Sequence, residues 1–226
     1  RRPPRSPLFP YTTLFRSVLF HSVDFLDRSV RADDVARIGM IDLQDGNRIV
    51  ELGETRAFSW QQGAMLQWWP HEPERHILYN SLVDGAYRTT VRNVETGETR
   101  LLSRPAAAVS RDGKQAVSIN FSRLANLRRG YGYDPLPDPY ASVEAPADDG
   151  IHRIDMMTGE SELVISIAQI VAYRHDASMD GRMHWFNHCQ FNTDDSRFVF
   201  LHRWKSDRSW MTRMFTAAPE IGRAHV

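Results

Sequence analysis

The chain has 226 residues, of which 42% are hydrophobic and 25% charged, and its 28 basic residues balance its 28 acidic ones. This balance, without any basic run, gives no support to nucleic-acid binding, and no apolar stretch approaches the roughly 20 residues that span a bilayer. The single cysteine, Cys189, excludes an internal disulfide, and we expect it to be a buried structural thiol.

The two ends of the chain do not follow the pattern of the rest. Residues 1–17 are basic and rich in proline, and both this segment and residues 220–226 resemble translated sequencing adapters. We therefore expect both segments to be artefactual flanks and exclude them from fold reasoning. The flanks hold five basic residues and one acidic residue, which leaves 23 basic against 27 acidic residues in the body, 18–219.

Within the body, one short pattern occurs three times: an alternating strand, a polar turn that contains glycine, and a second apolar strand. The copies are residues 37–46, 89–97 and 151–159. Asp42, Asn93 and Asp155 occupy the same position, four residues before the turn glycine. Asp-Gly and Thr-Gly turns supply the residue tolerant of positive φ that tight hairpins need. A hairpin that recurs at intervals of roughly 50–60 residues predicts the blades of a β-propeller.

A second class of hairpin lies between these copies, and each member precedes a β-rich strand. Its members are residues 70–75, 110–114 and 192–197. One blade is therefore expected to contain four antiparallel strands. The predicted fold is an all-β fragment of a β-propeller, with three to four blades and cut at both ends. The expected blades cover residues 18–56, 57–105, 106–168 and 184–219. An open arc of this kind leaves sheet edges without a pairing strand, so we expect poor solubility.

One long segment, 121–150, interrupts the rhythm of the blades. Its proline and glycine content argues against regular structure over much of its length, and a loop of this size is either functional or disordered. Its arginines and tyrosines suit an anionic or sugar-like ligand. The alternative is a structural flap that packs on a neighbouring blade. The candidate residues are Arg123 and Arg129 for catalysis and Tyr131 and Tyr133 for substrate binding, together with the channel-lining Gln61 and Gln62 from an earlier strand.

The strongest chemical cluster lies at the start of the last blade, in residues 183–191. Alternation with period two predicts that His184, His188 and Gln190 share one face, and the next strand brings His202 and Arg203 alongside. Imidazole nitrogens and an amide oxygen are suitable ligands for a divalent metal. The alternative is a set of hydrogen-bonding residues in the core and at the channel rim. Gln67 occupies a position equivalent to Gln190 two blades earlier, which favours this alternative.

The Asp-rich hairpins and glycine turns resemble the WD40-like repeats of TolB-type proteins. More narrowly, residues 188–195, followed by the strand 198–202, resemble a blade of the oligogalacturonate lyase family. That resemblance implies a propeller that cleaves acidic oligosaccharides by β-elimination with a manganese ion. The implied metal ligands are His184, His188, Gln190 and His202, and Arg123, Arg129 and Arg203 are candidates for the catalytic base.

A rival hypothesis is a non-catalytic TolB-like propeller that binds a protein or glycan partner through its channel face. The two hypotheses differ in one geometric consequence. A metal centre requires the imidazole nitrogens of His184, His188 and His202 to approach a common point, because metal–nitrogen bonds are about 2.0–2.1 Å long. The sequence leaves the cellular compartment open.

Overall fold

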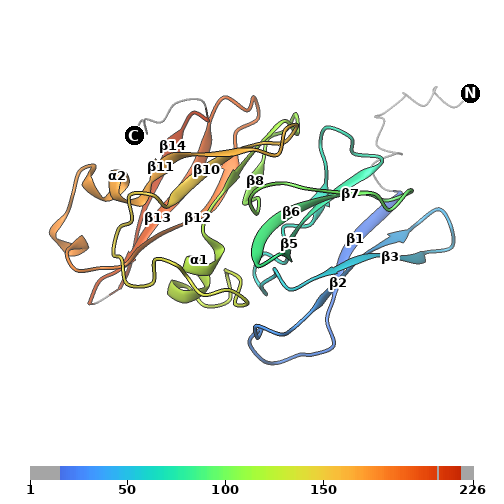
Figure 1. The fold of residues 1–226 in the computed structure, drawn as a ribbon, viewed down its shortest axis with the longest axis horizontal. Coiled ribbons are helices and arrows are strands. Elements are labelled where there is room, and N and C mark those ends of the chain that lie inside the picture. The colour runs from blue at the N-terminus through green and yellow to red at the C-terminus, as the bar shows by residue number, and fades with distance from the viewer. Residues whose placement is uncertain (1–15, 208, 220–226) are drawn as a thin grey trace, which may run out of the picture.

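The structure is a computed structural model that describes residues 16–207 and 209–219, and it contains four antiparallel sheets (Figure 1). In every sheet, strands that are adjacent in the chain are also adjacent in space. Sheet 1 contains β1 (Ser17–Ser22), β2 (Ala36–Asp42) and β3 (Arg48–Thr55). Sheet 2 contains β4 (Gln67–Trp68), β5 (His76–Val83), β6 (Ala86–Asn93) and β7 (Thr99–Leu101). Sheet 3 contains β8 (Ala108–Val109), β9 (Gln115–Ser118), β10 (Gly150–Asp155) and β11 (Ser161–Ser166). Sheet 4 contains β12 (His184–Phe191), β13 (Phe198–Lys205) and β14 (Trp210–Ala217).

These meander sheets confirm the predicted all-β class and give the chain the architecture of part of a β-propeller. Two short α-helices accompany the sheets, α1 (Phe121–Leu127) and α2 (Ile167–Ala172), together with a 3-10 helix, η2 (Ala177–Met179). Ser17, which the sequence pattern assigned to the N-terminal flank, is the first residue of β1. The other residues of the two expected flanks, apart from Arg16, lie outside the described part of the chain. No helix in the described part is both long and apolar enough to cross a membrane.

The repeated turn has a physical basis in its polar residue. The side chain of Asn93 accepts hydrogen bonds from the backbone N–H groups of Glu95 and Thr96, and Asp155 does the same for the two equivalent residues of its own turn. The glycine that follows has a φ of 79° at Gly97 and 82° at Gly159, in the left-handed region. The backbone hydrogen bonds of each turn are therefore satisfied by residues of the same turn, which explains why the pattern can be recognised in the sequence.

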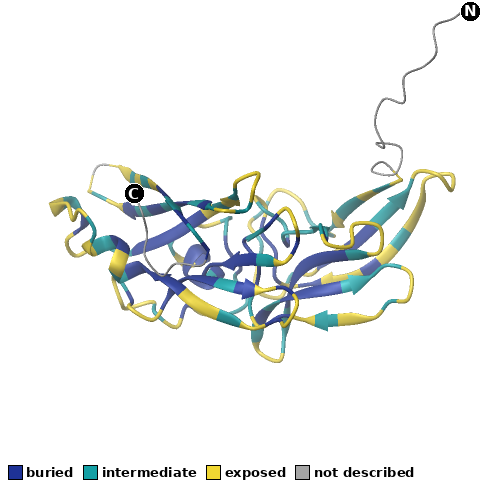
Figure 2. Ribbon diagram, turned by 90° about the horizontal axis from the view of Figure 1, so that it is seen from above, coloured by how far each residue is buried: buried dark blue, intermediate teal, exposed yellow. Residues whose placement is uncertain are grey.

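Apolar rows hold adjacent sheets together, and the buried residues form a continuous band through the molecule (Figure 2). Between sheets 1 and 2 the contacts involve Ile38, Leu52, Ile77 and Tyr79. Between sheets 2 and 3 they involve Leu78, Val91, Ala116 and Ile154, and between sheets 3 and 4 Val117, Ile151, Phe198 and Phe200. Full burial of one such large side chain contributes about 1.5–3 kcal/mol, so these rows dominate the stability of the stack.

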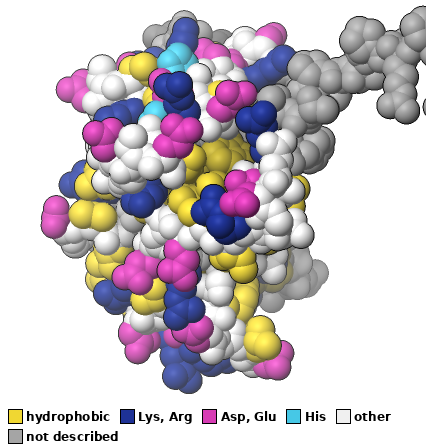
Figure 3. Space-filling view, turned by 90° about the vertical axis from the view of Figure 1, so that its right-hand side faces the viewer, with side chains coloured by type: hydrophobic (Ala, Val, Ile, Leu, Met, Phe, Trp, Pro, Cys, Tyr) yellow, Lys and Arg dark blue, Asp and Glu magenta, His cyan; other side chains and the backbone are white. Residues whose placement is uncertain are grey.

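The outer side of sheet 1 is different, because apolar side chains remain accessible there. Val18, Ile41 and Ile49 lie opposite one another on three neighbouring strands, and Val18 and Ile49 are 47% and 66% exposed. Figure 3 looks onto this end of the molecule and shows apolar side chains gathered in a band with charged side chains around it.

The connections divide the molecule into two faces. The β2–β3, β4–β5, β6–β7, β8–β9, β10–β11 and β12–β13 hairpins lie at one edge, which we call the turn face, whereas the β5–β6 and β13–β14 hairpins lie at the other. Neighbouring hairpins of the turn face touch: the Trp69 indole donates to Gly113 O at 2.7 Å. The longer connections, residues 56–66, 119–149 and 167–183, lie at the opposite edge, which we call the loop face. The expectation of irregular structure over much of the long insertion is confirmed for residues 128–149, whereas its first residues form α1. The Asn120 side chain caps that helix by accepting from the backbone N–H of Arg123 at 2.9 Å.

Candidate functional site

The long insertion is anchored by Tyr133, which is fully buried. Its ring stacks on Phe121 at 4.2 Å between centroids, and its hydroxyl accepts a hydrogen bond from the Asn80 side chain at 2.9 Å. Tyr87 donates its own hydroxyl to the carbonyl of Tyr133 at 3.0 Å. Burial raises the pKa of Tyr133 far above its usual range and that of Tyr87 to about 12. The expected substrate-binding role of Tyr133 is therefore wrong, because the residue is fully buried between sheet 2 and α1.

Arg123 is a second anchor and not a catalytic base. Its side chain is 1% exposed, and its five N–H donors meet five acceptors: Asp138 Oδ2 and the carbonyls of Tyr140, Val143, Glu144 and His184. Burial lowers its pKa, which nearby Asp138 and Asp149 oppose. No donor is left for a ligand, so the expectation of a catalytic Arg123 is corrected to a structural role.

A bulge in β12 overturns the expected sharing of one face by the predicted metal ligands. Asn187 lies opposite Leu201 and Gln190 lies opposite Val199, so β12 contains one extra residue over this stretch. His188 absorbs the extra residue with a φ of 53°. Gln190 therefore joins the face of Asn187, on the other side of the sheet from His184 and His202.

His184 and His202 do meet, and their tautomers follow from the donors around them. Arg213 can only donate, and its Nη2 lies 3.2 Å from Nδ1 of His202. Nε2 of His202 must then carry the proton, and it donates to Nδ1 of His184 at 3.0 Å. Nε2 of His184 donates in turn to Met179 O at 3.2 Å. Every ring nitrogen of the pair is thus already engaged.

Burial lowers the pKa of His184 to about 4 and that of His202 to about 2, so both rings are neutral near pH 7. This neutral pair does not fit the divalent metal that the family resemblance implies, because neither ring has a free lone pair to offer. His188 is exposed beyond the bulge, and Gln190 lies on the opposite side of the sheet. Within the described residues, no group of three or more His, Cys, Asp or Glu side chains could hold a metal.

A group of cationic and aromatic side chains does converge on the loop face, where the insertion meets sheet 4. The Arg128 guanidinium lies 5.2 Å from the ring centre of Tyr131 and 4.7 Å from that of Trp210. The Lys205 ammonium lies 5.6 Å from Trp210, which also contacts Trp185 edge-on at 5.6 Å. We call this group the cation–aromatic cluster; its members are Arg128, Tyr131, Trp185, His188, Arg203, Lys205 and Trp210.

Arg203 and His188 belong to the same cluster because burial and the nearby arginine charges lower their pKa values. Burial and the charge of Arg128 lower the pKa of Arg203, and burial followed by Arg203 and Arg128 lowers the pKa of His188. The His188 ring meets Tyr131 edge-on at 5.8 Å. Among the ion pairs of residues 16–207 and 209–219, none involves Arg128, Arg203 or Lys205. The cluster therefore presents positive charge without an internal counter-ion.

Several buried polar atoms beside this cluster have no hydrogen-bond partner within the protein. The donors are Nε of Arg128, Nε of Arg203, Nε1 of Trp185 and Nδ2 of Asn187, and Oδ1 of Asn187 is an acceptor without a partner. A buried donor without an acceptor costs about 1–3 kcal/mol, and native proteins leave few of them. Four at one place, beside unpaired cations, favour a site for an acceptor-rich ligand.

Three other predicted site residues are Gln61, Gln62 and Arg129. The backbone N–H of Gln61 donates to Gly130 O at 3.3 Å, next to Tyr131, and Gln62 has a buried side-chain oxygen without a partner. Arg129 is exposed, and its charge acts on Asp134. Cys189 is half-buried as a residue, and burial of its thiol raises the pKa to about 12, as suits a structural group.

Sequence reasoning missed Arg128, Lys205, Trp185 and Trp210 as members of the site. Arg128 directly precedes Arg129, and only the end of α1 decides which of the two points inward. The one signal available in the sequence was the density of arginine and tyrosine in the insertion.

No family model matches the chain, and no curated protein matches it in sequence. Among solved structures, the chain is similar to TolB from Acinetobacter baumannii, with a TM-score of 0.45 and 15% identity over 91% of this chain and 40% of that one. It is also similar to an oligogalacturonate lyase from Vibrio parahaemolyticus, with a TM-score of 0.47 and 14% identity over 91% of this chain and 52% of that one. A third match is the AtxE2 isopeptidase, with a TM-score of 0.35 and 11% identity over 90% of this chain and 43% of that one. The chain thus spans about half or less of each of these structures.

Proposed function

We propose that the chain is a propeller module that binds an acidic oligosaccharide on its loop face, through the cation–aromatic cluster. The single observation that carries this proposal is the set of unpaired cations beside four buried donors without acceptors. Carboxylates supply both the missing negative charge and the missing acceptors, and arginine binds them in a forked geometry.

The aromatic members favour a sugar acid over a bare inorganic anion. Tyr131 is half-buried and Trp210 is 44% exposed, so each offers part of an apolar surface beside a cation. A uronate has a carboxylate for Arg128 or Arg203 and an apolar ring face for the aromatic side chains. The proposal covers binding, and the partner it names is a short polymer of uronic acid.

The test is calorimetric titration with a short oligogalacturonate and with a neutral galactose oligomer of the same length. Arg128→Gln and Arg203→Gln should each weaken binding of the acidic oligomer by about 10- to 100-fold, as expected for a charge-assisted hydrogen bond. Arg153→Gln is the matched control, because Arg153 is on sheet 3 and pairs with Glu162, and it should bind as the wild type does. Equal affinity for the acidic and neutral oligomers would contradict the proposal.

A second candidate function is β-elimination at the same site, and His188 is the observation that favours it. Its exposed ring is held neutral beside two guanidinium groups, so it can accept a proton while they stabilise a carboxylate and the charge that develops next to it. The proton alpha to the carboxylate would pass to His188, a double bond would form between the alpha and beta carbons, and the bond to the leaving sugar oxygen would break, with that oxygen taking a proton from water.

The assay for this candidate is the ultraviolet absorbance of an unsaturated uronate product, measured with and without a chelator. His188→Ala should abolish the product while calorimetric binding of the oligomer remains measurable. Binding without any product, in the presence or absence of added divalent metals, would leave the binding module as the function and contradict elimination.

A further inference from the structure

A groove on the turn face lies between sheets 2 and 3, far from the cluster on the loop face. Its cavity volume is about 580 Å³, within the range of sites that hold small ligands or side chains. Side chains from both sheets line it, and the ones that matter below are Trp69, Glu72, Val91, Glu98, Arg100 and Met157.

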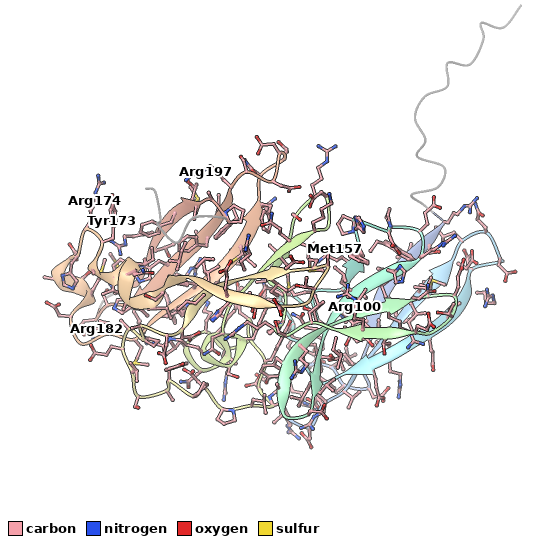
Figure 4. The ribbon with its side chains drawn as sticks, turned by 45° about the horizontal axis from the view of Figure 1, so that its top comes forward. Arg100, Met157, Tyr173, Arg174, Arg182 and Arg197 are labelled. Carbon is pink, nitrogen blue, oxygen red and sulfur yellow. The ribbon has the colours of Figure 1, made fainter. Side chains whose placement is uncertain are left out.

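The floor of this groove is apolar and fixed. Trp69 and Val91 are buried, and the Trp69 indole is held by its hydrogen bond to Gly113 O. Met157 comes from the β10–β11 turn of sheet 3 and is 52% exposed. Figure 4 shows Arg100 and Met157 next to one another where the two sheets meet, and the Arg100 guanidinium donates to Met156 O at 2.8 Å. The groove can therefore receive an apolar side chain.

The rim of the groove carries more negative than positive charge. Glu72 and Glu98 are exposed, and His76 lies beside Glu72 with its Nδ1 at 2.6 Å from the carboxylate. Arg100 is the only Lys or Arg among the residues that line the groove, and one of its amino groups donates to Met156 O. Its other amino nitrogen is buried without a partner and can donate to a carbonyl. A ligand with basic side chains and backbone carbonyls matches this rim.

The groove runs beside the free edge of sheet 2. β7 is the edge strand, and Arg100 lies opposite Val91, while Glu98 O and the N–H of Leu102 bond inward to β6. Alternation therefore turns the backbone groups of Thr99 and Leu101 outward. Further along the same edge, the N–H of Ser103 already donates to Gly159 O of sheet 3 at 2.9 Å. The β10–β11 turn of sheet 3 thus covers this edge at Leu101 and Ser103, where Gly159 packs, and leaves the outward groups of Thr99 next to the groove.

We propose that this groove binds a basic, extended peptide segment of a partner protein, which adds to the edge of β7 and places an apolar side chain on the floor of Trp69 and Val91. Main-chain hydrogen bonds to Thr99 would give the peptide its direction, and the glutamates would select its basic side chains. This inference does not depend on the function proposed for the loop face.

The test uses fluorescence anisotropy with a labelled probe peptide, acetyl-Lys-Leu-Lys-Val-Lys-amide, and its counterpart with glutamate in place of every lysine. Glu98→Lys should weaken binding of the basic probe about fivefold or more through the rim charge. Thr99→Pro removes one outward N–H without removing an inward bond of the sheet, and it should weaken binding by about fivefold. Glu54→Lys, an equal charge change on sheet 1, should have no effect.

A second readout keeps the proposal testable if a variant folds poorly. In the wild type, the methyl resonance of Met157 should move when the basic probe is added and stay in place with the acidic one. Unchanged affinity in Thr99→Pro would overturn strand addition. Equal binding of both probes, binding of neither, or a stationary Met157 resonance would overturn the proposed site.

Discussion

The turn face and the loop face are built by opposite means. On the turn face, each hairpin satisfies its own backbone, as Asn93 and Asp155 do, and neighbouring hairpins are joined by separate hydrogen bonds between exposed loops. On the loop face, one inserted segment joins sheets 2, 3 and 4 through Arg123 and Tyr133. Local satisfaction produces a repeat that can be multiplied, whereas the shared insertion produces a single, irregular surface where buried donors remain available to a ligand.

The largest effect that separates the two faces is expected from Arg123→Met. The substitution removes five hydrogen bonds and leaves the carboxylate of Asp138 buried without its partner. Breaking a buried pair in this way costs about 3–5 kcal/mol of unfolding free energy, measured by urea denaturation. Arg153→Met on the surface of sheet 3 is the control and should change stability by less than about 0.5 kcal/mol. A loss under 1 kcal/mol in Arg123→Met would show that the insertion is not an anchor.

As the pH falls, the loop face should lose stability at a higher pH than the turn face does. His152, His184 and His202 have folded pKa values of about 4, 4 and 2, all below the value of about 6.5 in an unfolded chain. Between pH 6.5 and 4 the unfolded state binds more protons, so stability is present above that window and is lost as the pH falls through it. Each histidine contributes at most about 1.4 kcal/mol per pH unit.

Hydrogen exchange at pH 7 and pH 5 measures this difference between the faces. Amides of residues 167–183, which are pinned by Met179 O and Arg213, should lose protection at pH 5 more than those of the β6–β7 hairpin. The double variant His184→Gln, His202→Gln should have a shallower dependence on pH. Equal loss of protection on both faces would contradict the assignment of the neutral pair to the loop face.

A smaller effect is expected from Tyr133→Phe, which keeps the stacked ring and removes its hydroxyl. Asn80 Nδ2 then loses one acceptor but retains Ala106 O at 2.8 Å. The expected loss is about 1 kcal/mol in thermal unfolding, as for an ordinary buried hydrogen bond. Tyr87→Phe, which removes a neighbouring hydroxyl that also bonds to the insertion, offers a matched comparison. Stability equal to the wild type in both variants would mean that ring packing alone holds the insertion.

The smallest effect is expected on the turn face, from Asp195→Ala. Its carboxylate accepts from the backbone N–H groups of Arg111 and Asp112 and so joins the hairpins of sheets 3 and 4. Because this link lies in solvent and each hairpin is satisfied locally, its loss should cost about 1 kcal/mol or less in urea denaturation. A cost as large as that of Arg123→Met would erase the distinction between the faces.

The parts of the molecule that could be predicted from the sequence are those determined by neighbours in the chain. The glycine turns and the strands around them follow from Asp42, Asn93 and Asp155, whose side chains bond to backbone groups two or three residues away. The insertion was recognised as a departure from this rhythm. Its short helix was not foreseen, because the cap at Asn120 stands among residues that otherwise favour loops.

The site could be predicted only in outline. The ring of Tyr131 contacts that of His188, and the charge of Arg203 acts on His188, but no pattern in the sequence predicted that the insertion and the last blade meet. The separation of Gln190 from His184 could not be read from a period of two, because a single residue in the left-handed region inverts the alternation. The burial of Arg123 depends on carbonyls 17–21 residues away and on a neighbouring sheet, which no local pattern records.

The central claim, that the cation–aromatic cluster binds a uronate, is tested most directly by the indole N–H resonance of Trp185 in a ¹⁵N-labelled protein. That N–H is buried without an acceptor, so a bound carboxylate should shift it downfield on titration with oligogalacturonate, and the shift should disappear in Arg203→Gln. The indole resonance of Trp69, already bonded to Gly113 O on the turn face, should stay in place. A stationary Trp185 resonance at ligand concentrations that saturate calorimetric binding would contradict the account.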